Sequence, residues 1–311
     1  EIVLMGVPEE RGNPDRPGSA EAPDVIRQYL YQLAAPLTTM AMADLGNLRT
    51  GHELPDTYIA LAEVTATLLR AGKILLVLGG TQDISFGLSQ GLEGLEVPVD
   101  YVSIDSSPDI LEPGEAAPNH SFHHQLLTYT PNYLNNFTLL GSQAHFLTEG
   151  ERKALKAMNF PTVPIGRLNQ DIREAEPHLR EAHAVSFDLS AIRHSDAPGT
   201  SHPSPAGFNV DQACQLARYT GMNYNAQAMA LCEVNPTADI RNMTSHTAAL
   251  IAWYFLEGFY NRLSDRPKAD RSNLRKYLVH LSGPISEIVF YKSEHSKRWW
   301  MEVPIHAASN T

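Results

Sequence analysis

Short apolar runs alternate with longer amphipathic stretches along this chain. Eight runs predict strands, at residues 2–7, 40–45, 73–78, 99–104, 137–141, 184–189, 228–234 and 287–291. Apolar positions at helical spacing predict helices between them, at residues 23–33, 57–71, 150–158, 211–220 and 245–263. The run 74–78 is apolar throughout, which is typical of parallel strands that helices cover on both faces. We therefore predict a three-layer α/β/α fold around a mostly parallel, roughly eight-stranded sheet.

The same pattern predicts a single domain over residues 1–311. A chain of 311 residues can form one large domain or two smaller ones. The Pro, Gly and Ser-rich segments 12–22 and 197–207 are too short for linkers, and each follows a predicted strand, so we expect loops that form a site. We expect a C-terminal extension at about 293–311, where Trp299 and Trp300 either pack in the core or mark an interface.

Charge and cysteine content narrow the class of protein. The net charge of −11 argues against nucleic acid or an anionic membrane surface as a partner. No run approaches the roughly 20 apolar residues that cross a bilayer, and residues 1–6 read as a strand rather than a signal peptide. The two cysteines, Cys214 and Cys232, are too few for a disulfide framework. These features predict a cytoplasmic protein with reduced thiols.

Acidic side chains stand where two apolar runs end. Asp105 follows the run 99–104 and Asp188 lies in the run 184–189, while a glycine pair follows the run 73–78. The carboxyl ends of parallel strands meet at one edge of a sheet, so we expect these residues to converge there, joined by Asp109. Three buried carboxylates repel one another and need a cation, an arginine or protonation. The alternative is that each aspartate only caps a helix or a turn.

Five short motifs, in one order along the chain, resemble those of the ureohydrolase superfamily of arginases, agmatinases and formimidoylglutamases. That family has GGDHS, DAHxD and SxDxDxxDPxxAPG, followed by ExNP. This chain has an opening stretch over residues 6–27 that resembles the family's first strand, loop and helix. It then has GGTQD at 79–83, Asp-Ser-Ser-Pro-Asp at 105–109, SFDLS at 186–190 continuing to APG at 197–199, and EVNP at 233–236. The resemblance implies an arginase-like fold for nearly the whole chain, and a homo-oligomer, either a trimer or a hexamer.

The resemblance also implies a metal site, from which this chain departs. Family members bind two Mn²⁺ ions whose bridging water attacks a guanidino or amidino carbon. By position, Asp105 and Asp188 match the carboxylates that bridge both metals, and Asp109 matches a ligand of the first metal. Gln82 replaces the histidine of the first metal. A residual site on these four residues would hold at most one Mn²⁺ or other divalent cation, and the alternative expectation is that no cofactor binds.

The second metal position keeps no ligand of its own. Ser107 replaces its histidine and Ser190 its terminal aspartate, and a serine hydroxyl is a poor substitute for either. Arg193 stands where the family has the Asp of its D-P pair. We hypothesise that the Arg193 guanidinium neutralises part of the carboxylate cluster in place of a metal. The alternative is that Arg193 points into solvent from its loop.

Glutamate and histidine side chains supply the remaining candidates. Glu233 matches the family residue that receives the cationic group of the substrate; the alternative is a purely local structural role near Asn235. His120, His123 and His124 form a cluster that offers a proton shuttle or, less expectedly, a replacement metal ligand. His194 and His202, which follow Asp188, belong to the same loop region, and ordinary solvated histidines explain most of this set.

Three functional interpretations follow. In the first, an arginase-like protein with a degraded manganese site binds a small guanidino or amidino ligand, or acts as a scaffold or regulator, without ordinary catalysis. In the second, it hydrolyses linear amidines with one metal held by Asp105, Asp109, Asp188 and Gln82. In the third, it is a structural subunit without ligand or metal. Activating water without a bound cation is difficult, which favours the first interpretation.

Overall fold

The computed structural model describes residues 1–36, 41–108, 110, 122–130, 132–263, 267, 271–282 and 287–303. The chain divides into two compact units, Glu1–Asn261 and Arg262–Thr311. The second unit thus begins well before residue 293, the predicted start of the extension. Among the described residues, no helix has the length and apolarity needed to span a membrane.

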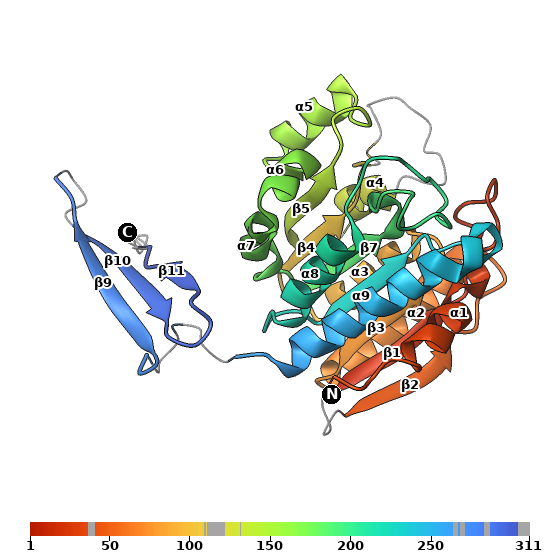
Figure 1. Cartoon of the computed structure of the whole chain (residues 1–311), viewed down its shortest axis with the longest axis horizontal. Helices are drawn as coiled ribbons and strands as arrows, with labels where there is room; N and C mark the ends of the chain where they lie inside the picture. The colour runs from red at the N-terminus through yellow and green to blue at the C-terminus, as the bar shows by residue number, and fades with distance from the viewer. Residues whose placement is uncertain are drawn as a thin grey trace. The chain divides into compact units, whose positions relative to one another are not determined.

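The first unit is built on an eight-stranded sheet in which every strand pair is parallel (Figure 1). Its strand order is β2-β1-β3-β8-β7-β4-β5-β6. The strands are β1 (Ile2–Val7), β2 (Met42–Asn47), β3 (Ile74–Gly79), β4 (Val99–Ile104), β5 (Leu134–Ser142), β6 (Thr162–Pro164), β7 (Ala184–Asp188) and β8 (Ala228–Cys232).

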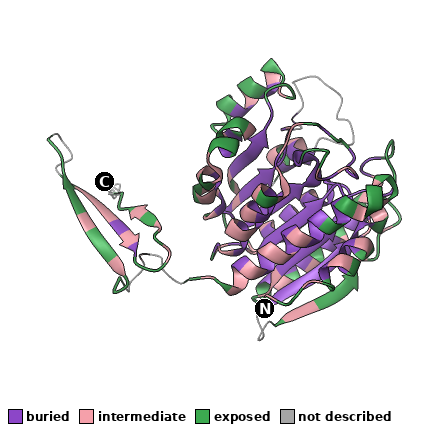
Figure 2. Ribbon diagram, viewed as in Figure 1, coloured by how far each residue is buried: buried purple, intermediate pink, exposed green. Residues whose placement is uncertain are grey.

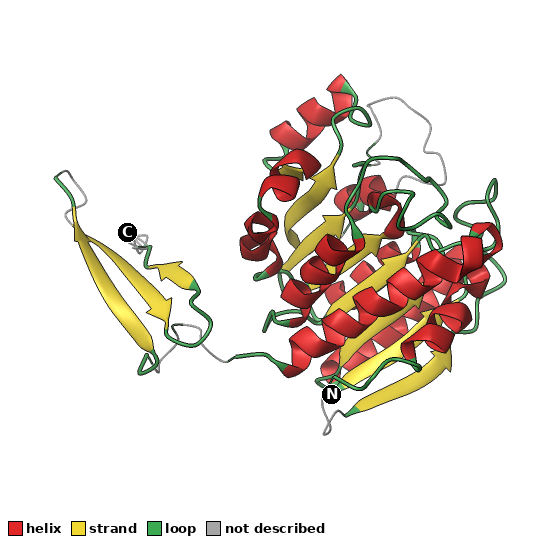
Figure 3. Cartoon of the chain, in the orientation of Figure 1, coloured by secondary structure: helices red, strands yellow, loops and turns green. Residues whose placement is uncertain are grey.

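Helices cover both faces of this sheet (Figure 3). They are α1 (Ala22–Leu30), α2 (Leu54–Arg70), α3 (Ile84–Glu93), α4 (Phe122–Thr128), α5 (Glu149–Ala157), α6 (Ile165–Gln170), α7 (Glu176–Leu179), α8 (Val210–Gly221) and α9 (Met243–Tyr260). One core joins the sheet to α1, α6, α7, α8 and α9, and the other joins it to α2, α3 and α4. In β3, Leu76 and Leu78 belong to the first core while Leu75 and Val77 belong to the second, which explains the uninterrupted apolar run. Figure 2 shows the inner strands of the sheet buried between the helical layers, whereas the edge strand β2 is largely exposed. The predicted three-layer fold is confirmed.

The second unit is a separate antiparallel sheet with the order β11-β10-β9. Its strands are β9 (Leu274–His280), β10 (Glu287–Ser293) and β11 (Trp299–Met301). The predicted strand at 287–291 therefore exists, but it does not belong to the main sheet. The eighth strand of the main sheet is the short β6, which the apolar pattern did not predict.

Candidate functional site

Four neighbouring strands deliver the candidate residues to one edge of the main sheet. β3, β8, β7 and β4 are consecutive in the sheet, and all four run in the same direction. Asp105 follows β4, Asp188 is the last residue of β7, and Glu233 follows β8. Adjacent parallel strands thus place these carboxylates side by side, as the strand-end pattern predicted.

Tight backbone packing supports this edge. A Cβ atom on Gly80 would lie 1.7 Å from the carbonyl oxygen of Glu9, so the turn after β3 requires glycine because the loop after β1 approaches it closely. The Gly80 carbonyl accepts a 2.9 Å hydrogen bond from the backbone N–H of Glu233. Glu233 itself has a φ of 66°, an unfavourable conformation for a residue with a side chain and one that clusters at functional sites.

A cavity of about 310 Å³ opens at this edge. Its lining consists of Gly12, Asn13, Gln82, Asp83, Asp105, Ser106, Ser107, Phe122, Phe146, Asp188, Ser190, His202 and Glu233. Four of these residues are carboxylates, and the lining includes no arginine or lysine among the described residues. The pocket is therefore acidic, and it is of the size that suits a small ligand.

The lining includes residues that the motifs did not single out. Gly12 and Asn13 come from the segment 12–22, which was predicted to be a site-forming loop. Phe122 and Phe146 add apolar surface, and no signal in the sequence pointed to either. Their place in the lining depends on the three-dimensional path of the segments that lead back to the sheet edge, which the sequence pattern does not give.

Gln82 joins two of the carboxylates. Its side-chain Nε2 donates to Asp105 Oδ2 at 2.6 Å, and its backbone N–H donates to Glu233 Oε1 at 2.7 Å. The amide nitrogen, rather than the amide oxygen, therefore faces Asp105. Gln82 acts here as a hydrogen-bond donor that holds the acidic side chains in place, because carboxylates accept such bonds strongly.

Backbone N–H groups support the two aspartates. The Ser190 N–H donates to Asp188 Oδ1 at 2.6 Å, and the Ser107 N–H donates to Asp105 Oδ1 at 3.1 Å. Burial raises the pKa of Asp188 well above its ordinary value, and the charges of Asp105 and Glu233 raise it further. The cluster therefore carries the mutual repulsion that the sequence predicted, and it favours either a proton or a cation.

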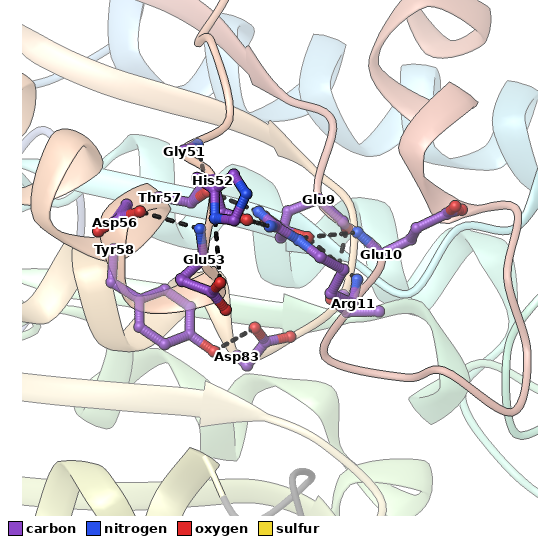
Figure 4. A network of polar contacts seen from close by, with 11 residues as sticks. Glu9, Glu10, Arg11, Gly51, His52, Glu53, Asp56, Thr57, Tyr58 and Asp83 are labelled. Atoms are coloured by element: carbon purple, nitrogen blue, oxygen red, sulfur yellow. Dashed lines mark hydrogen bonds and ion pairs between the residues drawn. The ribbon is translucent and has the colours of Figure 1, made fainter.

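Asp83 is the fourth carboxylate of the lining, and its side chain faces the Tyr58 hydroxyl (Figure 4). Although it precedes α3, its side chain makes no capping hydrogen bond and instead accepts from the Tyr58 hydroxyl at 2.5 Å. Burial raises the Asp83 pKa. Nearby, Arg11 Nε donates to Glu9 Oε1 at 2.8 Å, and Arg11 Nη1 donates to the backbone carbonyl of His52 at 2.7 Å. These hydrogen bonds connect the loop after β1 to the segment before α2.

Arg193 does not reach the carboxylate cluster. Its Nε donates to Asp196 at 2.9 Å, and its side chain is 45% exposed. The hypothesis that the Arg193 guanidinium neutralises the aspartates is therefore wrong for this structure. A nearer acidic partner, three residues along the same loop, takes the arginine instead.

The histidine candidates lie in different places in the structure, and only some of them are near the pocket. His123 is fully buried on α4, where its Nε2 lies 2.8 Å from Ser103 Oγ, and burial lowers its pKa to about 3. A neutral ring enclosed in the core cannot serve as a proton shuttle for the pocket. His124 lies on α4 outside the pocket lining, whereas His202 lines the pocket. His120 and the metal-ligand candidate Asp109 lie outside the described residues.

Within the part of the chain that the structure describes, no group of three or more His, Cys, Asp or Glu side chains is arranged to hold a metal ion. Asp109 lies outside these residues. The assignment of Asp105, Asp109, Asp188 and Gln82 as residual metal ligands stays a prediction.

Known proteins share this architecture. The formimidoylglutamase of Photorhabdus laumondii is 22% identical over 275 residues, covering 83% of this chain and 86% of that protein. The human mitochondrial guanidino acid hydrolase is 24% identical over 277 residues, covering 82% of this chain and 77% of that protein.

Solved structures agree on the fold. Trypanosoma cruzi formiminoglutamase with Mn²⁺ matches with a TM-score of 0.77 at 21% identity, covering 84% of this chain and 94% of that one. Bacillus subtilis arginase matches with a TM-score of 0.70 at 22% identity, covering 82% of this chain and 98% of that one. The model of the arginase family matches residues 1–257, nearly the whole first unit. The chain therefore belongs to the arginase family.

Proposed function

We propose that the acidic pocket binds a small planar cation with a guanidino or amidino group, and that it does so without two-manganese hydrolysis. The observation that carries the proposal is the lining itself, with four carboxylates and no arginine or lysine among its described residues. A guanidinium or amidinium group offers paired N–H donors that match carboxylate oxygens and also supply the missing positive charge. The names of the relatives, formimidoylglutamase and guanidino acid hydrolase, fit ligands of this class.

Glu233 is the residue we assign to the cation. It is buried, it lines the pocket beside Asp188, and its Oε1 is held by the Gln82 N–H. A fixed carboxylate binds a cation with little loss of side-chain entropy, because its conformation is already set before the ligand arrives. These contacts favour a role in ligand binding over a purely local structural role.

The donor set is a poor fit to a two-manganese centre. Gln82 presents its amide nitrogen to Asp105, and Ser107 and Ser190 offer neutral hydroxyls at the positions that the family resemblance assigns to metal ligands. Both aspartates are already held by backbone N–H groups. We therefore assign no hydrolytic step to this pocket and regard ligand binding as its function, with a scaffold or regulatory role as the consequence.

Calorimetry with agmatine, arginine and formiminoglutamate tests the proposal on the full chain. We expect agmatine to bind saturably and the variant Glu233→Gln to weaken binding by about 10-fold or more, since a hydrogen bond to a charged group contributes about 1.5–3 kcal/mol. The matched control is Glu93→Gln, which changes a carboxylate on α3 outside the pocket and should leave the affinity unchanged.

Metal analysis and turnover assays separate the alternatives. Protein purified with added Mn²⁺ is examined for bound metal and for release of urea, ammonia or formamide. Binding without turnover supports the proposal. Stoichiometric tight metal together with turnover would overturn it in favour of the one-metal amidine hydrolase. A chain that shows no response to any of the three ligands would instead be a structural subunit.

A further inference from the structure

A second and larger cavity lies at the outer edge of the main sheet. Its volume is about 560 Å³, within the range of small-molecule sites. Its lining comes from the ends of β5 and β6, from α5 and from the loops that join them: Ser142, Ala144, Leu147, Arg152, Leu155, Lys156, Asn159, Phe160, Pro161, Thr162 and Pro164. It shares no lining residue with the acidic pocket, although Phe146, the neighbour of Leu147, lines that pocket.

The lining of this second cavity carries positive charge from Arg152 and Lys156. Arg152 and Lys156 are four residues apart on α5, so they share one face of the helix. The lining includes no aspartate or glutamate among the described residues. Lys156 forms no ion pair with any described residue, and Arg152 pairs only loosely with Glu149, whose carboxylate lies 4.0 Å away. Glu149 is shared with Lys153, whose Nζ lies 3.5 Å away.

The remaining lining of this cavity is largely apolar. Leu147, Leu155 and Phe160 provide a wall for a hydrocarbon group. Thr162 also lines the cavity, but its Oγ1 is enclosed by protein atoms and is not accessible from the open space. The cavity therefore offers a ligand an apolar wall beside two cationic side chains.

We infer that this cavity binds a small organic carboxylate with an apolar body. The carboxylate pairs with Arg152 and Lys156, which match its charge and its hydrogen-bonding geometry. The apolar body packs on Leu155 and Phe160, which removes its CH₂ groups from water. The inference rests on no part of the function proposed for the acidic pocket.

Titration of the full chain with hexanoate tests this site. Calorimetry measures the binding, and the NMR signal of the Thr162 methyl group reports whether it occurs in this cavity. We expect saturable binding, and at least about 10-fold weaker binding of acetate, which lacks most of the apolar body. Hexylammonium, with the same body and the opposite charge, should not bind. Hexanoate that does not saturate at millimolar concentration, or acetate that binds equally well, would overturn the inference.

Substitutions on α5 locate the site. The double variant Arg152→Gln/Lys156→Gln should lose at least about 10-fold in hexanoate affinity. Lys153→Gln is the matched control, because Lys153 lies on the same helix, is 75% exposed and does not line the cavity. Should the double variant fail to fold, Lys156→Gln alone carries the test. Binding that survives loss of both cations, or that falls equally with Lys153→Gln, contradicts the assignment.

Discussion

Asp188 carries much of the electrostatic cost of the acidic pocket. The side chain is buried, and burial first, then the charges of Asp105 and Glu233, raise its pKa above the ordinary value of 3.8. The folded chain therefore keeps a proton that the unfolded chain releases near that value. The stability associated with this group is fully present below the unfolded pKa and is lost as the pH rises toward the folded pKa.

Asp188→Asn should accordingly stabilise the chain above about pH 5, by about 1–2 kcal/mol. The amide retains an oxygen that can accept from the Ser190 N–H, and it removes the charge that Asp105 and Glu233 repel. The difference between variant and parent should increase with pH. Urea unfolding from about pH 4 to about pH 8 measures it. The same variant should abolish any metal-dependent turnover.

Asp196→Asn is the control of opposite sign. Burial acts to raise the Asp196 pKa, but hydrogen bonds from Arg193 and Ser195 outweigh it and lower that pKa. Its contribution to stability is present above the unfolded pKa and is lost as the pH falls, so the variant should be less stable at neutral pH. Equal effects of the two substitutions would contradict our account of Asp188.

At the scale of elements, the turn after β3 fixes how the loop after β1 meets the site. A Cβ on Gly80 would lie 1.7 Å from the Glu9 carbonyl oxygen, a backbone atom that cannot move without shifting that loop. We expect Gly80→Ala to reduce the free energy of unfolding by about 3 kcal/mol, as overpacking does in a well-packed region. Urea unfolding checks the loss, and agmatine binding should weaken with it.

Gly166→Ala provides the matched comparison. Gly166 lies in α6, and nothing lies within 4 Å of the position that a Cβ would occupy. Alanine there should raise stability by about 0.5–1 kcal/mol, because it lowers the conformational entropy of the unfolded chain. If both glycine variants lost stability to the same extent, close approach at Gly80 would not be the cause.

Local pattern located the buried strands β1, β3 and β4 of the main sheet. It placed β1 and β4 at their observed bounds and β3 within one residue. It failed for β6, whose three residues include Pro164 and are too short for any period to appear. It found β10 but could not assign its sheet, since strand pairing depends on contacts distant in sequence.

In the site, too, the residues at strand ends were predicted correctly, whereas the loop residue Arg193 was not. Asp105, Asp188, Gln82 and Glu233 come together because strand order alone determines their positions. Arg193 was misassigned because a loop side chain takes the nearest partner, here Asp196, and neither composition nor spacing records which way a loop turns.

At the scale of the whole molecule, the two units differ in the size of their hydrophobic cores. The two core clusters consist entirely of residues from Glu1–Asn261. Among the described residues of the second unit, Tyr291 is the only buried large apolar side chain, while Trp299, Met301 and Val303 are exposed. A three-stranded sheet needs a covered apolar face for independent stability. The first unit has the core of a complete domain, whereas the second does not.

A chain that ends at Asn261 should therefore fold without the second unit. We expect its thermal midpoint to lie within about 4 °C of the full chain, the shift that about 1 kcal/mol produces in a domain of this size. Agmatine affinity should be unchanged, because all the described residues that line the acidic pocket precede Asn261. The isolated segment 262–311 should lack a cooperative unfolding transition, since it buries too little apolar surface to offset its conformational entropy. A truncated chain that aggregates or melts far below the parent would mean that the core of the first unit is not sufficient.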